Sequence, residues 1–280
     1  MLSSLNKEVV FFNDKSSYKL TDIKGLKFLD AIEEDVEVNT NTTEINGTDG
    51  VLIGPTSFGP FNLILNFSFK GIDTNDLKLY KQRLRKILYQ REPFYLWHSD
   101  APGKKYAVYC DSTENEDLTN SFATFKVSFV VFKGYSESMY DTSHIRVNDE
   151  TWQFQTGVQV NDDSLLYKHT TTGFKIFNGS DIKIDPLLRH KLIIYINIDA
   201  PNGFILWNRT TNEKFAYKGP VKSTQAFTLK GVHPLLDGKR VGHKSNWQWL
   251  TLEKGYNDFQ FLGDGIKNIN VEFVFNYIYR

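Results

Sequence analysis

The sequence is poor in several residue types, and each shortage excludes a class of structure. Its 280 residues include a single cysteine, Cys110, which excludes an internal disulfide and a cysteine-rich zinc site. No stretch approaches the roughly 20 apolar residues of a membrane-spanning helix, so we expect no membrane partner. Lys7 and Glu8 stand where a signal peptide has its apolar segment. These shortages predict a protein made in a reducing cytoplasm.

The sequence also lacks the motifs of common catalytic and cofactor sites. It has no nucleophile elbow, no phosphate-binding glycine loop and no EF-hand loop. Its six histidines form no His-X-His or His-X-X-X-His pair. Residues 161–164 and 178–181 carry oxygen ligands that calcium accepts, but turns of this composition are far commoner than calcium sites. We therefore expect no metal and no cofactor.

Carboxylates occur in two acidic runs, residues 33–35 and 114–117. A glycosidase needs two carboxyl groups held about 5–10 Å apart, one of them with a raised pKa. Adjacent acids repel each other, so we expect both runs in solvated loops. The sequence predicts that the protein is not an enzyme, and a cell-wall hydrolase is the enzyme alternative.

The composition favours β-structure in two units. Aromatic residues make up 15% of the chain, and Phe and Tyr fit a pleated, half-buried surface. The net charge is zero, but residues 1–150 hold 17 basic against 22 acidic side chains, and residues 151–280 hold 16 against 11. The resulting charges of −5 and +5 favour two separate units. Neither unit is basic enough to predict a nucleic-acid partner.

The first half predicts a small β-barrel or sheet with one α-helix. Residues 63–69 and 125–131 alternate apolar residues with others at a period of two, as half-buried strands do. A helix is predicted over residues 76–90, with Asp73 or Thr74 as its N-cap. Its apolar side recurs at steps of three and four and comprises Leu77, Tyr80, Leu84 and Ile87 or Leu88.

A glycine- and proline-rich segment, residues 46–60, interrupts this pattern. Its apolar residues, taken to lie at the tip, belong to no obvious strand pair; they are Val51, Leu52, Ile53 and Phe58. One interpretation is a mobile surface loop. The other is an extended arm that covers these side chains against a neighbouring subunit, because a monomer would leave them in water.

The second half predicts an antiparallel β-sandwich. Short apolar segments recur between Gly, Pro and Asn residues, without a helical period. They are residues 152–154, 174–177, 192–198, 204–207, 226–229, 246–252, 259–261 and 270–279. We expect an N-terminal domain over 1–133, a linker over 134–149 and a sandwich over 150–280. The terminal strand, 270–280, could pair with either domain.

The predicted helix is strongly basic. Lys78, Lys81, Arg85 and Lys86 lie on it, with no acid between Asp76 and Glu92. Nucleic-acid binding normally adds aromatic stacking positions or a basic domain, and this domain is acidic overall. We therefore interpret the helix as an intersubunit surface that meets an acidic patch of the next copy.

Four of the five tryptophans lie in the second half. Trp247 and Trp249 are two residues apart on a predicted strand and would share one face. Flat aromatic side chains stack on sugar rings, so a carbohydrate contact is one interpretation. Packing in the core is the other.

Several elements in order resemble the distal tail proteins of siphophages that infect Gram-positive bacteria. The resemblance covers about the first 133 residues well and the last thirty loosely. Its elements are Phe58-Gly59-Pro60, the strand end at 67–71, the basic helix, residues 92–96, residues 102–106, and Leu252-X-X-Gly255-X-Asn257 before an aromatic terminal strand.

This resemblance implies a structural protein of the virion tail tip. Six copies of the N-terminal domain would form a ring, with segment 46–60 embracing an adjacent subunit. The second half would be a galectin-like or carbohydrate-module-like sandwich that decorates the ring. The implied partners are the protein itself as a homohexamer, the tail tube protein, the tail-associated baseplate protein and receptor-binding proteins. The alternative is a module that binds host cell-wall carbohydrate.

Overall fold

A computed structural model describes residues 7–144 and 165–280 of the chain. The chain divides into two compact units, residues 1–137 with Arg280 (unit 1) and residues 138–279 (unit 2). Strands predominate in both, and α1 (Thr74–Leu88) is the one α-helix among the described residues. The expected mainly β fold with a single helix in the first half is confirmed.

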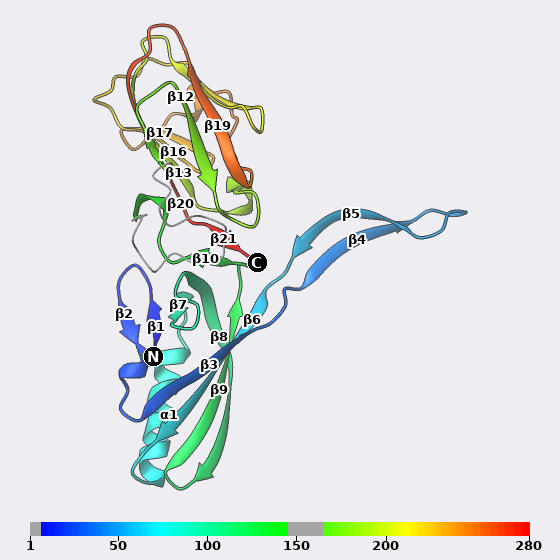
Figure 1. The fold of residues 1–280 in the computed structure, drawn as a ribbon, viewed down its shortest axis with the longest axis vertical. Helices are drawn as coiled ribbons and strands as arrows, with labels where there is room; N and C mark the ends of the chain where they lie inside the picture. Colours follow the sequence, from blue (N-terminus) through cyan, green and yellow to red (C-terminus); the bar gives the residue numbers. More distant parts are fainter. Residues whose placement is uncertain (1–6, 145–164) are drawn as a thin grey trace. The chain divides into compact units, whose positions relative to one another are not determined.

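Unit 1 is an antiparallel sheet covered by α1 (Figure 1). Its main sheet runs in the order β2-β1-β7-β8-β9-β6-β3, and a separate ribbon pairs β4 with β5. The strands are β1 (Val9–Phe12), β2 (Ser17–Lys19), β3 (Leu26–Glu33), β4 (Val38–Glu44), β5 (Val51–Phe58), β6 (Phe61–Lys70), β7 (Phe94–His98), β8 (Lys104–Thr119) and β9 (Phe122–Val131), with a 3-10 turn, η1 (Leu20–Asp22).

The centre of this sheet follows the alternation of the sequence. β6 and β9 pair along their whole length, from Phe61 opposite Val131 to Lys70 opposite Phe122. Their inward side chains form one core with the apolar side of α1, which comprises Leu77, Tyr80, Leu84 and Leu88. Each such side chain contributes about 1.5–3 kcal/mol when buried.

The N-terminus of α1 is fixed by a capping hydrogen bond. The Asp73 carboxylate accepts the backbone N–H of Asp76 at 2.9 Å, as expected for an N-cap. One turn later, the Tyr80 ring stacks on Phe69 of β6, with ring centroids 3.9 Å apart. These two contacts set where the helix begins and how it lies on the sheet.

The acidic run 114–117 is not a loop. It lies in β8, and Glu114 and Glu116 stand opposite Lys126 and Thr124 of β9. Their side chains are exposed, so the strand keeps the carboxylates in water while its backbone pairs. Pairing to β9 therefore determines the structure here, and the repulsion that predicted a loop is relieved by solvation.

Unit 2 contains two antiparallel sheets, in the orders β11-β20-β13-β16-β17-β18 and β12-β19-β14-β15. Their strands are β11 (Lys168–His169), β12 (Gly173–Asn178), β13 (Leu192–Asp199), β14 (Phe204–Asn208), β15 (Glu213–Tyr217), β16 (Phe227–Lys230), β17 (His233–Leu236), β18 (Lys239–Arg240), β19 (Gly255–Leu262) and β20 (Lys267–Phe275). Two further strands outside these sheets, β10 (Ser136–Ser138) at the boundary and β21 (Ile278–Tyr279), pair with each other. Short 3-10 turns are η2 (Thr142–His144), η4 (Pro186–Leu188) and η5 (Gly242–Lys244).

Aromatic side chains join the two sheets face to face. Phe273 of β20 lies 4.8 Å from Phe259 of β19, and Phe227 of β16 lies 5.1 Å from Phe204 of β14, measured between ring centroids. These rings alternate with outward-facing residues along their strands. The arrangement is a β-sandwich with an aromatic core.

Two predicted strands of the second half differ in the structure. Residues 246–252 form no strand, because the Asn246 side chain takes the backbone partners that a strand would use: it donates to the Lys214 carbonyl and accepts the Ala216 N–H. Segment 270–279 is broken into β20 and β21, and β20 pairs with β11 and β13 of unit 2. The predicted strand 152–154 lies outside the described residues.

The chain passes between the units after Glu137 and again before Arg280. The first passage lies within the predicted linker 134–149, whose residues 145–149 are outside the described residues. Residues 134–144 include β10 and η2. The Ser138 hydroxyl accepts the Tyr277 N–H at 3.0 Å, and the Thr142 hydroxyl donates to the Phe273 carbonyl at 2.7 Å. This segment is therefore built into the fold.

One buried histidine makes the stability of unit 1 depend on pH. His98 is 3% exposed, stacks on Tyr106, and has no hydrogen-bond partner for either ring nitrogen among the described residues. Burial lowers its pKa from 6.5 to about 4. Its neutral form is therefore the one that the core accepts.

We expect the free energy of unfolding to decrease as the pH falls from about 6.5 to about 4. In this range His98 binds a proton in the unfolded chain but stays neutral in the folded protein. The effect of this one group is at most about 3 kcal/mol. His98→Phe should remove that part of the pH dependence in denaturant titrations at several pH values. An unchanged slope in the variant would contradict this assignment.

Candidate assembly surfaces

The segment predicted as an arm is one half of a two-stranded ribbon. β4 and β5 pair from Val38 opposite Phe58 to Glu44 opposite Val51, and in the described chain they pair only with each other. The ribbon continues the β3–β6 pair through the hydrogen bond from the Gly59 N–H to the Glu37 carbonyl, and extends beyond those strands (Figure 1). The arm is thus longer than predicted, residues 38–58.

β4 was not predicted from the sequence because its side chains are mostly Thr and Asn, with no apolar alternation. The turn between the two strands contains Gly47 and Gly50. Both adopt positive φ, a conformation that residues with a Cβ rarely adopt. Val51, Leu52 and Ile53 lie near this turn, whereas Phe58 lies at the root. There the Arg280 guanidinium stacks on the Phe58 ring, 3.8 Å from its centroid.

A β-bulge puts four apolar side chains of the arm on one face. Thr40 pairs with Thr56 and Thr42 with Ile53, so two residues of β5, Gly54 and Pro55, oppose one of β4. Proline has no N–H to donate, which is why it is tolerated at a bulge. Because one extra residue reverses the alternation, Ile53 and Val51 point to the same side as Phe58 and Val38.

That face is open to solvent. The exposed fraction is 73% for Ile53, 49% for Val51 and 59% for Val38, and Leu52 on the other face is 58% exposed. Such a run of exposed apolar residues on a strand with free edges is typical of a surface that another chain covers.

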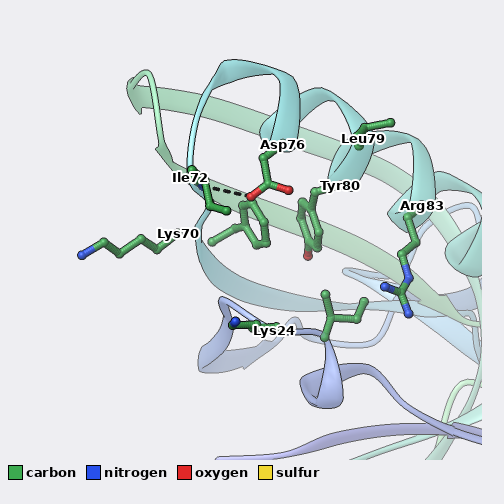
Figure 2. A pocket seen from close by; sticks show the side chains of 10 residues that line it. Lys24, Lys70, Ile72, Asp76, Leu79, Tyr80 and Arg83 are labelled. Carbon is green, nitrogen blue, oxygen red and sulfur yellow. Dashed lines mark hydrogen bonds between the residues drawn. The ribbon is translucent and has the colours of Figure 1, made fainter.

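A second surface is a groove beside α1, a hollow of about 510 Å³. Figure 2 shows Arg83 on one side of Tyr80 and Lys24 and Lys70 on the other, with the Lys70 ammonium pointing away from Tyr80. Apolar side chains line it as well: Ile23, Phe69, Ile72 and Leu79. Ile72 is 90% exposed and Leu79 is 66% exposed.

The four basic residues predicted as an intersubunit surface lie on α1, but they are not equivalent. Lys81 forms a salt bridge with Asp117 of the same chain at 2.7 Å and is thereby engaged. Lys78, Arg85 and Lys86 are exposed and form no ion pair within the part of the chain that the structure describes. Three of the four therefore stay available for a partner.

An acidic hollow of about 510 Å³ lies on the sheet of unit 1. Asp30, Glu114 and Glu116 line it together with Lys126, which pairs with Glu114 at 3.6 Å. Unit 1 thus presents separate basic and acidic surfaces, as the intersubunit interpretation of α1 requires.

The two tryptophans singled out in the sequence have different environments. Trp249 is half-buried and lines a small crevice with the core residues Leu229 and Leu250, so it lies at the edge of the sandwich core. Trp247 is 72% exposed, and its six-membered ring packs on Gly242. They share no strand face.

The backbone holds Trp247 in the left-handed region, with φ at +58°. This conformation costs roughly 1–2 kcal/mol for a bulky residue. Hydrogen bonds fix the two residues before it: the Ser245 hydroxyl accepts the Trp247 N–H, and the Asn246 carboxamide oxygen accepts the Ala216 N–H. The exposed position of the indole therefore depends on a backbone conformation that is unfavourable for tryptophan.

Metal and membrane sites find no support in the described residues. No group of three or more His, Cys, Asp or Glu side chains lies close enough there to hold a metal ion. No helix among them is both long and apolar enough to cross a bilayer. Of the two calcium-like turns, 161–164 lies outside the described residues. In the other, Asn178 is buried and bonded to the backbone of Ile182 and Leu252.

Comparison with known proteins shows what the first unit is similar to. A family model for the phage tail protein RIFT-related domain matches residues 13–131. This part of the chain is similar to a phage tail domain, and it is called the phage tail domain below. The match spans β2 to β9 and includes both the arm and α1.

The fold of the whole chain is that of a distal tail protein. The crystal structure of SPP1 Dit (gp 19.1), described as a paradigm of the hub adsorption apparatus in Gram-positive infecting phages, aligns with a TM-score of 0.69 over 98% of this chain and 99% of that one, at 12% identity. Together with the phage tail domain, this match confirms the resemblance inferred from the sequence.

Two further structures align more weakly. The phage p2 baseplate in its activated conformation with Sr matches at a TM-score of 0.44 and 13% identity, covering 96% of this chain and 97% of that one. The phage P2 baseplate with Ca matches at 0.45 and 11%, covering 97% and 98%. No curated protein sequence matches this chain.

The two tryptophans of unit 2, Trp247 and Trp249, should respond differently to mutation. We expect Trp247→Asn to leave the free energy of unfolding within about 0.5 kcal/mol of the original, because asparagine tolerates the left-handed conformation and the indole is exposed. Trp249→Ala should lower it by about 2 kcal/mol or more, since it removes packed apolar surface. Denaturant titration of both variants measures the difference, and equal losses would contradict the two environments.

Proposed function

We propose that this protein is a structural hub of a phage tail tip. Six copies form a ring through their phage tail domains. The ring joins the tail tube protein to the tail-associated baseplate protein and supports receptor-binding proteins, while unit 2 decorates it. The protein is assembled into the virion tail and catalyses no reaction. The phage tail domain and the distal tail protein fold support this role.

The arm is the observation that carries the proposal. An isolated two-stranded ribbon is at best marginally stable in water, and this one leaves its apolar face uncovered. A neighbouring copy can both cover that face and pair with a free strand edge. Because the arm and the surface that receives it differ, the contact is heterologous and closes into a ring if the rotation fits.

The charges of unit 1 support the same arrangement. Lys78, Arg85 and Lys86 project from α1, and the acidic hollow holds Asp30, Glu114 and Glu116. Surfaces of opposite sign on one unit favour contact between copies and steer their approach. Such exposed pairs contribute little each, so we assign them to orientation and the arm to affinity.

Removal of the arm should prevent ring formation without unfolding the protein. We expect a variant with residues 39–57 replaced by Asn-Gly to fold, because a two-residue turn of this type closes the ribbon where Val38 pairs with Phe58. Mass measurement in solution, alone and with the tail proteins of the phage, should show a hexamer for the natural protein and a monomer for the variant.

The control for that experiment is the unfolding transition of the variant, which should stay within about 1 kcal/mol of the original since the arm packs on little else. A stable variant that still forms hexamers would contradict the role of the arm. A natural protein that stays monomeric with all tail components would contradict the hub itself.

The second candidate is a contact with cell-wall carbohydrate, which the strained, exposed Trp247 favours. The ring of Trp247 lies on Gly242. The residues on either side of Gly242 in sequence include four exposed basic or histidine side chains: Lys239, Arg240, His243 and Lys244. An aromatic platform among cations suits an anionic glycan.

We expect Trp247→Ala to abolish binding of a phosphate-bearing wall polymer. Titration calorimetry of the natural protein and the variant with that polymer measures the binding. Trp249, predicted as a second contact, is half-buried, and its conservative variant Trp249→Phe should bind as the original does. Equal binding by the Trp247→Ala variant, or no binding by the natural protein, would reject this function and leave the hub proposal intact.

A further inference from the structure

The groove beside α1 has the chemistry of a receptor for an acidic, apolar segment. Its walls carry three cations, Lys24, Lys70 and Arg83, against one carboxylate, Asp76. That carboxylate is already engaged, because it accepts the Ile72 N–H at 2.9 Å. The three cations are exposed and form no ion pair among the described residues.

The apolar part of the groove is preformed. Phe69 and Tyr80 stack with their rings 8° from parallel and are almost completely buried, so the floor is rigid. Ile72 and Leu79 stand above this floor at the sides of the opening and remain exposed (Figure 2). An incoming apolar side chain would cover both of them, which is the usual arrangement of a central apolar contact with a polar rim.

The tip of the arm matches this groove in both respects. Within residues 38–58 the only charged side chains are Glu44 and Asp49, and both are acidic. Glu44 ends β4 and Asp49 lies in the turn before β5, near the exposed apolar residues Ile45 and Val51. The tip therefore offers two negative charges and a cluster of apolar side chains on a narrow ribbon.

We propose that the groove beside α1 receives the arm tip, residues 44–53, of a neighbouring copy. The apolar tip residues cover Ile72 and Leu79, and the carboxylates of Glu44 and Asp49 lie among Lys24, Lys70 and Arg83. No arm residue of the same chain lines the groove. This inference rests on the proposed ring and names the surface that accepts the arm within it.

Photo-crosslinking tests the contact directly. A benzophenone amino acid at position 79 of the full-length protein, irradiated in a mixture of isotopically light and heavy copies, should yield light–heavy crosslinks whose peptides contain residues 44–53. The same probe at Tyr195, an exposed residue of β13 in unit 2, should yield none with that segment. Crosslinks from position 79 to any other segment would overturn the proposal.

Charge reversal supplies a second test. Lys70→Glu with Arg83→Glu should raise the protein concentration needed for assembly about tenfold, the effect of losing several surface ion pairs at once. The matched control, Lys168→Glu with Lys230→Glu, makes the same charge change on exposed residues of unit 2 and should assemble as the natural protein does. Combining the groove variant with Glu44→Lys and Asp49→Lys should restore assembly.

The outcomes separate the two levels of the proposal. A natural protein that forms no ring in any condition overturns the hub function and the groove contact together. A groove variant that assembles at the original concentration overturns only the groove contact. The unfolding transitions of the groove variant and of the arm variant show whether each is folded. If both are folded and the arm substitutions do not restore assembly, the arm tip binds elsewhere.

Discussion

The constraint on which the molecule depends is that a two-stranded ribbon cannot bury its own side chains. β3 and β6 meet this constraint where they lie in the main sheet, because α1 covers their inward face. Beyond the sheet the same two segments continue as β4 and β5, where the described chain covers only Phe58, by Arg280, and leaves the other apolar side chains exposed. The arm is thus an ordinary hairpin carried past the edge of its own core. Its need for a partner follows from that extension.

The parts of the fold with strong periodicity were predictable from the sequence. The alternation of Leu63 to Phe69 and the three-four spacing of Leu77, Tyr80 and Leu84 each place one face in the core, and both were correct in type and position. Burial of apolar side chains dominates the energetics of these elements, so their pattern is visible in the residues themselves.

The parts set by backbone pairing and local polar contacts were not predictable. β4 consists of Thr and Asn that stay in solvent, and the acids of β8 sit in a strand because β9 pairs with it. At Trp247, side-chain hydrogen bonds of Ser245 and Asn246 replace a strand with a turn. In each case the structure depends on backbone pairing or on polar side-chain hydrogen bonds, which leave no apolar pattern in the segment itself. The groove beside α1 combines η1, β6 and the helix, which is why the basic residues of α1 were identified but Lys24 and Lys70 were not.

The bulge at Gly54 and Pro55 has a consequence for how a closed assembly controls its own size. Because the bulge places Val38, Val51, Ile53 and Phe58 on one face of the arm, each copy in the proposed ring donates its arm in one direction and accepts an arm from the other. In that proposed assembly, an unclosed row of copies ends in one uncovered arm and one empty acceptor surface, and each end can bind a further copy. In the proposed ring, only closure occupies both the arm and the acceptor surface of every copy.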